Sequence, residues 1–232
     1  MNSFFDKIYI INLKRSVERR DHQITQMKKY NITNYVFIEG ILGSTVNMKE
    51  LKKTKQWAFK GNDFCKNTCS CKGGGHFLTA NQIGLFQAHY NIWKDMLKNN
   101  YTKCLILEDD CIFTEAVANF NTVIKDIPDN WELLYLGHAA LVGSVPNENS
   151  SFKKLLKGIA QAHIYAITSE CAKILIQHTY PFRAAVDGYF AHFMTNNKVL
   201  KNVYSSKTHF GTNGSLYTEK GIRFKTIIRN RW

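Results

Sequence analysis

The stretch Lys103-Cys104-Leu105-Ile106-Leu107-Glu108-Asp109-Asp110 decides how this chain folds and where its chemistry lies. Its first part is a short apolar run, which is typical of a buried β-strand. Its last part places three carboxylates directly after that strand. Because ionised carboxylates lose solvation inside a packed core, the three acids are expected at an edge of a sheet. Ligands of α/β proteins gather at such strand ends.

The three acids admit two interpretations. Carboxylate oxygens are the ligands that hard divalent cations prefer, and such a cation can hold a diphosphate. A solvated acidic turn after an ordinary strand explains the same residues equally well, because acidic triplets are common. Evidence from the rest of the chain has to separate the two.

Length and composition indicate one folded domain. The chain has 232 residues, of which 44% are hydrophobic and 13% aromatic, as in globular proteins. Only 3 prolines are present, and no stretch has the composition of a linker. We therefore expect a single domain over residues 1–232, with a cysteine-bearing loop at 57–77 and a basic tail at 220–232.

The net charge of +13 favours anionic partners, although the lysines are scattered and form no long basic run. The tail at 220–232 interleaves basic and apolar residues, for which packing against the domain is the favoured interpretation and peripheral contact with a membrane the alternative. No stretch is long and apolar enough to span a bilayer, and the N-terminus lacks a signal-peptide core. We therefore expect a soluble, cytoplasmic protein, and the sequence gives no indication of its oligomeric state.

The cysteines fall into two groups. Cys65, Cys69, Cys71 and His76 crowd into one segment whose spacing, C-x3-C-x-C-x4-H, matches no standard zinc site. A mobile cysteine-bearing loop is the favoured interpretation, with a structural zinc ion or a local disulfide as the alternative. The other three cysteines are expected as small core residues: Cys104, Cys111 and Cys171.

Strand and helix patterns alternate along the chain, which predicts a doubly wound α/β sheet. Strands are expected at 7–12, 34–40, 103–107, 131–137, 162–167 and 199–204, the first two parallel. Helices are expected from Val17, capped by Ser16, and at 49–55, 79–98, 114–126, 169–178 and 183–197. Residues 143–154 are expected as a polar loop. The chain contains no G-x-G-x-x-G, no P-loop and no G-x-S-x-G, which argues against dinucleotide binding, P-loop chemistry and serine hydrolysis.

Ordered motifs give the chain a resemblance to a known family. Ile11-Asn12-Leu13-Lys14-Arg15, followed by Glu18-Arg19-Arg20, resembles the opening of glycosyltransferase family 25. Further matches follow in the same order: Glu39-Gly40, the helix motif 83–89, Leu107 to Asp110, Trp131 to Gly137, Ala162 to Thr168, and Val186-Asp187. Leu85 and Ala88 depart from the Cys and Ser of the family's helix motif. The resemblance implies a GT-A type fold, a Rossmann-like, mostly parallel sheet flanked by helices.

The resemblance also implies a UDP-sugar donor bound through Mn²⁺ or Mg²⁺. It makes Asp110 the expected metal ligand and places Glu108 on the ribose or on a metal-bound water. His209 is a further candidate ligand, with a surface histidine in a turn as the alternative.

Other residues are expected around the nucleotide. Asn12, Leu13 and Arg15 end the first strand, where the base and diphosphate would lie. Arg20 could reach the phosphates, although a solvated helix face explains it and Arg19 equally well. Glu39 could hydrogen-bond the nucleoside.

An inverting transfer needs a carboxylate that takes the proton of the acceptor hydroxyl. Asp187 is the expected base, with capping of the next helix as its plain alternative. Asp109 is the second candidate, although a nearby metal would lower its basicity.

The sequence as a whole predicts a metal-dependent, inverting hexosyltransferase, with galactose from UDP-galactose as the family's donor. The acceptor would be a glycan or a hydroxylysine-containing protein, and the positive charge slightly favours an anionic one. Two alternatives remain: a non-catalytic module that binds glycans or nucleotides, and a basic nucleic-acid-binding protein. The chain lacks the motifs of the latter, so we expect no nucleic-acid partner.

Overall fold

The computed structural model describes residues 1–54, 78–138, 144–145, 150–156, 158–159, 161–181, 183–195 and 199–214. The predicted cysteine-bearing segment, with Cys65, Cys69, Cys71 and His76, lies outside the described residues, as does the basic tail at 220–232. The other three cysteines, Cys104, Cys111 and Cys171, are buried free thiols, as predicted.

Strands and helices alternate along most of the chain. The strands are β1 (Lys7–Asn12), β2 (Tyr35–Glu39), β3 (Lys103–Glu108), β4 (Cys111–Phe113), β5 (Leu133–Tyr135), β6 (Ser144–Val145), β7 (Phe152–Leu155), β8 (Ile164–Thr168), β9 (Val203–Ser206) and β10 (Gly211–Asn213). The α-helices are α1 (Val17–Lys29), α2 (Met48–Lys53), α4 (Ala80–Lys98), α5 (Phe120–Val123), α6 (Ser169–Gln177) and α7 (Val186–Thr195). Short 3₁₀ turns are η1 (Gly43–Thr45), η2 (Glu115–Asn119) and η3 (Ile124–Asp126). None of the described helices is long and apolar enough to cross a membrane.

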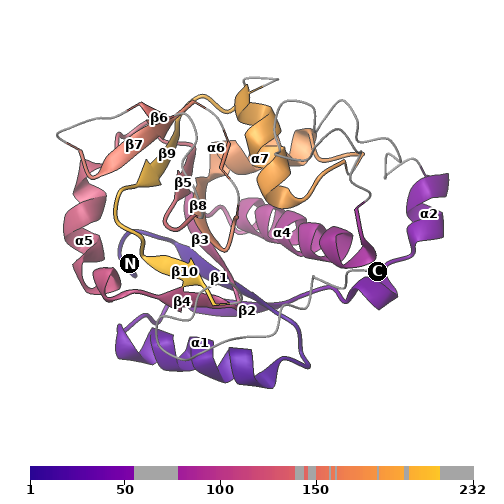
Figure 1. Ribbon diagram of the computed structural model, residues 1–232, viewed down its shortest axis with the longest axis horizontal. Helices are drawn as coiled ribbons and strands as arrows, with labels where there is room; N and C mark the ends of the chain where they lie inside the picture. Colours follow the sequence, from indigo (N-terminus) through magenta and orange to yellow (C-terminus); the bar gives the residue numbers. More distant parts are fainter. Residues whose placement is uncertain are drawn as a thin grey trace.

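Eight of the described strands form one large sheet with the order β2-β1-β3-β8-β5-β9-β7-β6 (Figure 1). β1 pairs in parallel with both β2 and β3, and β5 pairs in parallel with β9. β8 runs antiparallel to its neighbours β3 and β5, and β7 runs antiparallel to β9 and β6. The other strands therefore share one direction, which confirms the predicted α/β class with a mostly parallel sheet.

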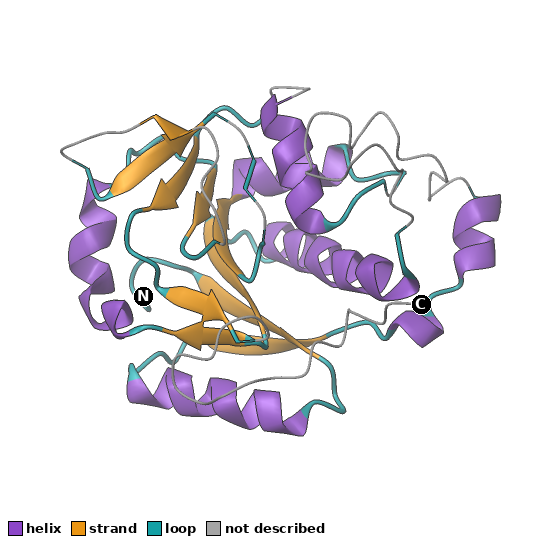
Figure 2. Ribbon diagram, in the orientation of Figure 1, coloured by secondary structure: helices purple, strands orange, loops and turns teal. Residues whose placement is uncertain are grey.

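Helices cover both faces of this sheet (Figure 2). On one face, α4, α6 and α7 pack over the strands in a core that includes Trp93, Tyr165 and Phe190. On the other face, α1 and α5 enclose a second core that includes Met27 and Phe120. Successive strand residues alternate between the two cores, for example Leu105 and Ile106 of β3, as the pleat requires.

Local hydrogen bonds set the ends of the helices on the first face. Thr79 and Gln82 form a reciprocal capping box that starts α4. Asn100, with a φ of 56°, adopts the left-handed conformation just beyond the end of that helix. The hydroxyl of Thr168 accepts a hydrogen bond from the backbone N–H of Cys171 at the start of α6, so Thr168 caps this helix.

Two sequence expectations were wrong. The segment 143–154, expected as a polar loop, contains the paired strands β6 and β7. Their residues do not alternate between apolar and polar, so the sequence did not indicate these strands. On α1, the helical spacing of Val17, Ile24 and Met27 predicts that they share a buried face. Val17 is instead 59% exposed and Ile24 39% exposed, whereas the polar side chains of Gln23 and Gln26 are buried. The helical segment expected at 114–126 is confirmed from Glu115 to Asp126, where it consists of η2, α5 and η3 in succession.

A second, two-stranded sheet lies beyond the acidic turn. β10 pairs antiparallel with β4, Asn213 opposite Cys111, and the backbone N–H of Gly214 donates to the carbonyl of Asp110 at 2.7 Å. Gly137 lies directly beneath this sheet. A Cβ atom at Gly137 would lie 2.1 Å from the carbonyl oxygen of Gly211, closer than any real contact. Only glycine therefore lets β10 approach the main sheet here.

We expect Gly137→Ala to lower the free energy of unfolding by about 3 kcal/mol, because a backbone carbonyl cannot move aside as a flexible side chain can. Gly40→Ala is the matched control, since its Cβ would come no closer than 3.3 Å to any atom, and the atom at that distance belongs to the flexible side chain of Leu13, which can shift slightly. Urea denaturation of both variants measures the difference. Equal midpoints would show that β10 tolerates displacement.

Candidate active site

The predicted site residues come together at one edge of the sheet. β1, β2 and β3 are parallel and in register, with Asn12 beside Glu39 and Ile11 beside Glu108. Their carboxyl ends therefore meet, and the turn after β3 carries Asp109 and Asp110 into the same region. This edge is where a mostly parallel sheet binds its ligands.

Asp109 holds this region together. One of its carboxylate oxygens accepts a hydrogen bond from Asn12 Nδ2 at 2.8 Å, and the other pairs with Arg19 Nη1 at 2.6 Å. All three residues are buried. We call these contacts the Asp109 clamp. Because its carboxylate is paired with the buried guanidinium of Arg19, Asp109 is arranged to position the turn, and this charge pairing argues against its predicted role as second candidate base.

The buried polar face of α1 extends the clamp. Gln23 donates hydrogen bonds to the backbone carbonyls of Asp109 and Cys111, at 3.1 and 2.7 Å. Gln26 donates to the carbonyl of Cys111 at 3.0 Å and accepts from the backbone N–H of Phe113. Arg19, Gln23 and Gln26 follow one another at helical spacing, which places them on one face of α1. Because this buried face is polar, a pattern of apolar residues does not identify it.

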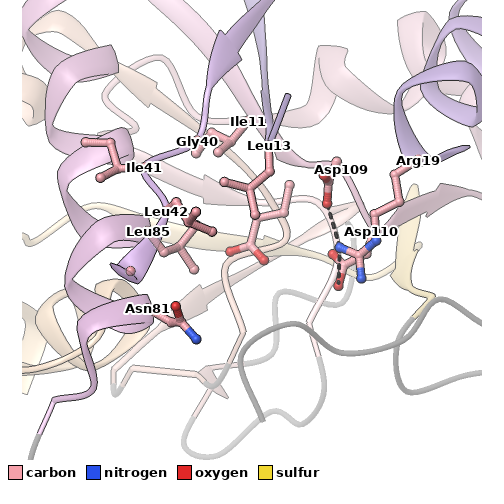
Figure 3. Close-up of a pocket in the computed structure, with 12 residues that line it drawn as sticks. Ile11, Leu13, Arg19, Gly40, Ile41, Leu42, Asn81, Leu85, Asp109 and Asp110 are labelled. Atoms are coloured by element: carbon pink, nitrogen blue, oxygen red, sulfur yellow. Dashed lines mark hydrogen bonds and ion pairs between the residues drawn. The ribbon is translucent and has the colours of Figure 1, made fainter. Parts of the chain in front are cut away.

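A cavity opens beside the clamp (Figure 3), and we call it the donor-side cavity. Its two ends differ chemically. Arg19, Asp109 and Asp110 gather at one end, and Ile41, Leu42 and Leu85 lie at the other. It is lined by Ile11, Leu13, Arg19, Gly40, Ile41, Leu42, Gly43, Asn81, Leu85, Glu108, Asp109 and Asp110. The cavity therefore offers a hydrophobic surface at one end and carboxylates at the other.

Glu108 is an acid of this region whose pKa is strongly raised. Burial raises its pKa to about 7, and the negative charges of Asp109 and Asp187 act in the same direction, while Arg19 opposes them. Its side chain is nevertheless 19% exposed, so it reaches the cavity. A carboxyl group that loses its proton near neutrality is suited to bind a cation or exchange a proton.

A buried histidine stands behind Glu108. His89 Nε2 lies 3.6 Å from Glu108 Oε1, and His89 Nδ1 lies 2.8 Å from the hydroxyl of Tyr165. Trp93 Nε1 donates to that hydroxyl at 3.2 Å, which leaves the hydroxyl proton of Tyr165 for His89 Nδ1. Burial lowers the pKa of His89 to about 3, so the ring is neutral and its Nε2 proton faces Glu108.

A second cavity, which we call the acceptor-side cavity, adjoins the first. It is lined by Gln82, Leu85, Phe86, Glu108, Gln161, Ala162, His163, Ala185, Val186, Asp187 and Asn213. Glu108 and Leu85 line both cavities. Asp187, the predicted base, accepts hydrogen bonds from the backbone N–H of Gln161 at 3.0 Å and of Gly188 at 2.8 Å. The structure thus brings Asp187 and Glu108 to one cavity from opposite parts of the sequence.

The other predicted nucleotide contacts divide into two groups. Leu13, Arg15 and Glu39 line an outer hollow that shares Leu13, Gly40, Ile41 and Leu42 with the donor-side cavity. The guanidinium of Arg20 lies 3.8 Å from the centre of the Phe37 ring, on the outside of α1, and Arg20 lines neither cavity. The arginine that reaches the acids is Arg19, and Asn12 supports the clamp.

His209 is not grouped with Asp110. Its Nε2 atom lies 3.2 Å from Nε2 of His138. Across the part of the chain that the structure describes, no three histidine, cysteine, aspartate or glutamate side chains form a cluster that could hold a metal ion by themselves. The predicted three-ligand set of Glu108, Asp110 and His209 is therefore not preformed.

Sequence comparisons find curated relatives of this chain. The chain is 28% identical to human procollagen galactosyltransferase 2 over 151 residues, which are 62% of this chain and 22% of that protein. It is 26% identical over 140 residues to the inactive glycosyltransferase 25 family member 3 of Mus musculus, covering 57% of this chain and 22% of that protein. The chain thus spans about a fifth of the length of these curated relatives.

Among solved structures, the chain resembles a glycosyltransferase involved in the glycosylation of the major capsid of PBCV-1, with a TM-score of 0.44 and 11% identity. That alignment covers 86% of this chain and 81% of the other. At the level of families, residues 5–190 match glycosyltransferase family 25, described as an LPS biosynthesis protein. The matched region includes the acidic turn, with Glu108 that lines both cavities, and also includes Asp187. The chain therefore belongs to glycosyltransferase family 25.

Proposed function

We propose that this chain transfers a hexose, galactose from UDP-galactose, to a hydroxyl group of a glycan or of a hydroxylysine-containing protein. The observation that carries this proposal is the pair of cavities that share Glu108 at the end of β3. A group-transfer enzyme needs two substrates to meet at one point, and these cavities supply two adjoining sites. Family membership supports the reaction class, and the name of the human relative supports galactose as the sugar.

The donor-side cavity suits a nucleotide sugar. Ile41, Leu42 and Leu85 offer apolar contacts to a nucleobase and ribose, with Leu13, Arg15 and Glu39 along the outer hollow. The acidic end then receives the diphosphate, whose negative charge the carboxylates cannot hold without a cation.

A divalent cation, Mn²⁺ or Mg²⁺, fits this acidic end. Glu108 and Asp110 both line it, whereas the carboxylate of Asp109 is already engaged by Arg19 and Asn12. Such ions are commonly held by one or two carboxylates together with substrate phosphates, so the protein need not supply a complete cluster. When bound, the ion would stabilise the charge that develops on the departing diphosphate.

Chemistry would occur where the cavities meet. The acceptor hydroxyl attacks the anomeric carbon from the acceptor side while the bond from that carbon to the β-phosphate oxygen breaks, which inverts the configuration. The hydroxyl proton passes to Asp187, whose carboxylate is held in place by two backbone N–H groups. Glu108, with Nε2 of His89 behind it, is positioned between the two substrates.

A second candidate function is binding without turnover. It is favoured by one observation: a mouse relative of similar identity is named as inactive. Turnover separates the two. Titration of UDP with and without Mn²⁺, followed by measurement of UDP release from several UDP-sugars, should show metal-dependent binding and release from UDP-galactose. Binding without release from any UDP-sugar would favour the non-catalytic module, and retention on heparin without UDP binding would favour a nucleic-acid-binding protein.

Asp110→Asn should reduce the transfer rate by about 100-fold or more, because it removes one negative charge from the proposed cation site. The fold should persist, because the backbone N–H of Gly214 donates its hydrogen bond to the backbone carbonyl of Asp110, which the substitution does not alter. Asp21→Asn, on the exposed face of α1, is the charge-matched control and should transfer at the normal rate. A normal rate in the Asp110 variant would end its assignment as a ligand.

The raised pKa of Glu108 predicts a pH-dependent stability. Its pKa of about 7 in the folded protein exceeds the ordinary value of 4.5, so the folded state favours the protonated acid. Stability should therefore fall as the pH rises from 4.5 through 7, by at most about 3 kcal/mol in the absence of metal.

Glu108→Gln carries no charge at any pH and should remove this part of the pH dependence. Denaturant titrations at pH 5 and pH 8, in the presence of a chelator, compare the variant with the unaltered chain. Adding Mn²⁺ at pH 8 should then stabilise the unaltered chain more than the variant. A variant that is less stable than the unaltered chain at pH 8 would contradict the assigned cause.

A further inference from the structure

A buried histidine on α4 faces the acid that the two cavities share. His89 is 0% exposed, and its Nε2 atom lies 3.6 Å from Glu108 Oε1. This distance is too long for a hydrogen bond, and among the described residues Nε2 has no hydrogen-bond partner. Buried polar atoms of folded proteins are almost always hydrogen-bonded, so an unpaired nitrogen aimed at an acid of the site indicates a function beyond packing.

The pleat of the sheet directs Glu108 toward this histidine. Ile106 of β3 lies opposite Tyr165 of β8, and both side chains belong to the core that α4 covers. Glu108 follows Ile106 by two residues, so its side chain leaves the sheet on the same face. The approach of Glu108 to His89 is therefore set by a strand and a long helix, which hold position better than a loop does.

Two further side chains determine which nitrogen of His89 carries the ring proton. His89 Nδ1 lies 2.8 Å from the hydroxyl of Tyr165, and Trp93 Nε1 donates to the same hydroxyl at 3.2 Å. An indole N–H can only donate, so the tyrosine oxygen accepts from Trp93 and still has its own proton to donate. Among the described residues, only His89 Nδ1 can receive that proton, which leaves the proton of the neutral ring on Nε2. We call these three side chains the Trp93–Tyr165–His89 row.

We propose that His89 is a positioning residue for the transfer, whose Nε2 proton holds Oε1 of Glu108 and so turns the second carboxylate oxygen toward the point where the cavities meet. This inference rests on the proposed function and adds a residue that acts through Glu108, because His89 itself lines neither cavity. The second oxygen remains for the cation proposed at the acidic end. The contact of 3.6 Å shortens to a hydrogen bond in the complex with substrates, as hydrogen bonds that are long in a free enzyme commonly do.

Two substitutions separate the two nitrogens of the ring. In His89→Gln the side-chain amide nitrogen lies near the place of Nε2 and can still donate to Glu108. In His89→Asn it lies near the place of Nδ1, so the contact with Tyr165 is kept and the donor toward Glu108 is lost. Two quantities are measured on the full chain: the affinity for Mn²⁺ with UDP present, from the electron paramagnetic resonance signal of the free ion, and kcat for UDP release from UDP-galactose. The asparagine variant should lose about tenfold or more in both, whereas the glutamine variant should stay within about threefold of the unaltered chain.

Tyr165→Phe tests the row itself. It removes the donor to Nδ1, so the proton of His89 should distribute over both nitrogens and the Mn²⁺ affinity should fall. NMR of the chain labelled with nitrogen-15 in histidine shows which ring nitrogen is protonated, and the signal of His89 is identified by its loss in His89→Gln. Tyr135→Phe is the matched control: it removes a hydroxyl from the same core that is buried and has no partner among the described residues, so neither measurement should change.

A proton on Nδ1 of His89 in the unaltered chain would overturn the proposal, and so would equal Mn²⁺ affinities and kcat values for the glutamine and asparagine variants. Should His89→Asn not fold, as judged by circular dichroism, the comparison of Tyr165→Phe with Tyr135→Phe decides the question alone. Absence of UDP binding, or of UDP release from every UDP-sugar, would instead overturn the proposed function. Because the position of the ring proton is measured without turnover, the two failures can be told apart.

Discussion

The structure depends on the Asp109 clamp, a buried ion pair and hydrogen bond that join three separate parts of the chain. Asp109 lies in the turn after β3, Arg19 on α1 and Asn12 at the end of β1. A buried charge is tolerated only when it is paired and hydrogen-bonded, and Asp109 has both kinds of partner. The clamp thereby fixes the direction of the acidic turn and leaves its neighbours, Glu108 and Asp110, at the donor-side cavity.

Much of the fold could be predicted from sequence because most elements carry a strong periodic pattern. The apolar runs of β1, β3 and β8 and the long stripe of α4 correspond to observed elements. The elements that were missed are held by partners distant in sequence. β10 is a strand because it pairs with β4 and fits into the space beside Gly137, and β7 is a strand because it pairs with β9. A local sequence pattern therefore does not predict either strand.

The site was predictable in part for the same reason. Strand ends can be inferred from the sequence, and this places Leu13, Glu108 and Asp110 at the donor-side cavity. Side-chain direction around a helix is harder to infer when the buried face is polar, which is why Arg19 was missed in favour of Arg20. Gln161 Oε1 and His163 Nδ1 are buried and lack a hydrogen-bond partner among the described residues. Their positions depend on long-range packing that no motif encodes.

The polar inward face of α1 also limits how this protein can be engineered. Stabilising a helix commonly means enriching its buried side in leucine and similar residues. Here Gln23 and Gln26 supply the hydrogen bonds that the backbone of the β3–β4 turn needs, so leucine at either position would leave buried carbonyl and N–H groups unsatisfied. Redesign for thermostability should therefore spare these glutamines and begin with Val17 and Ile24, which face the solvent.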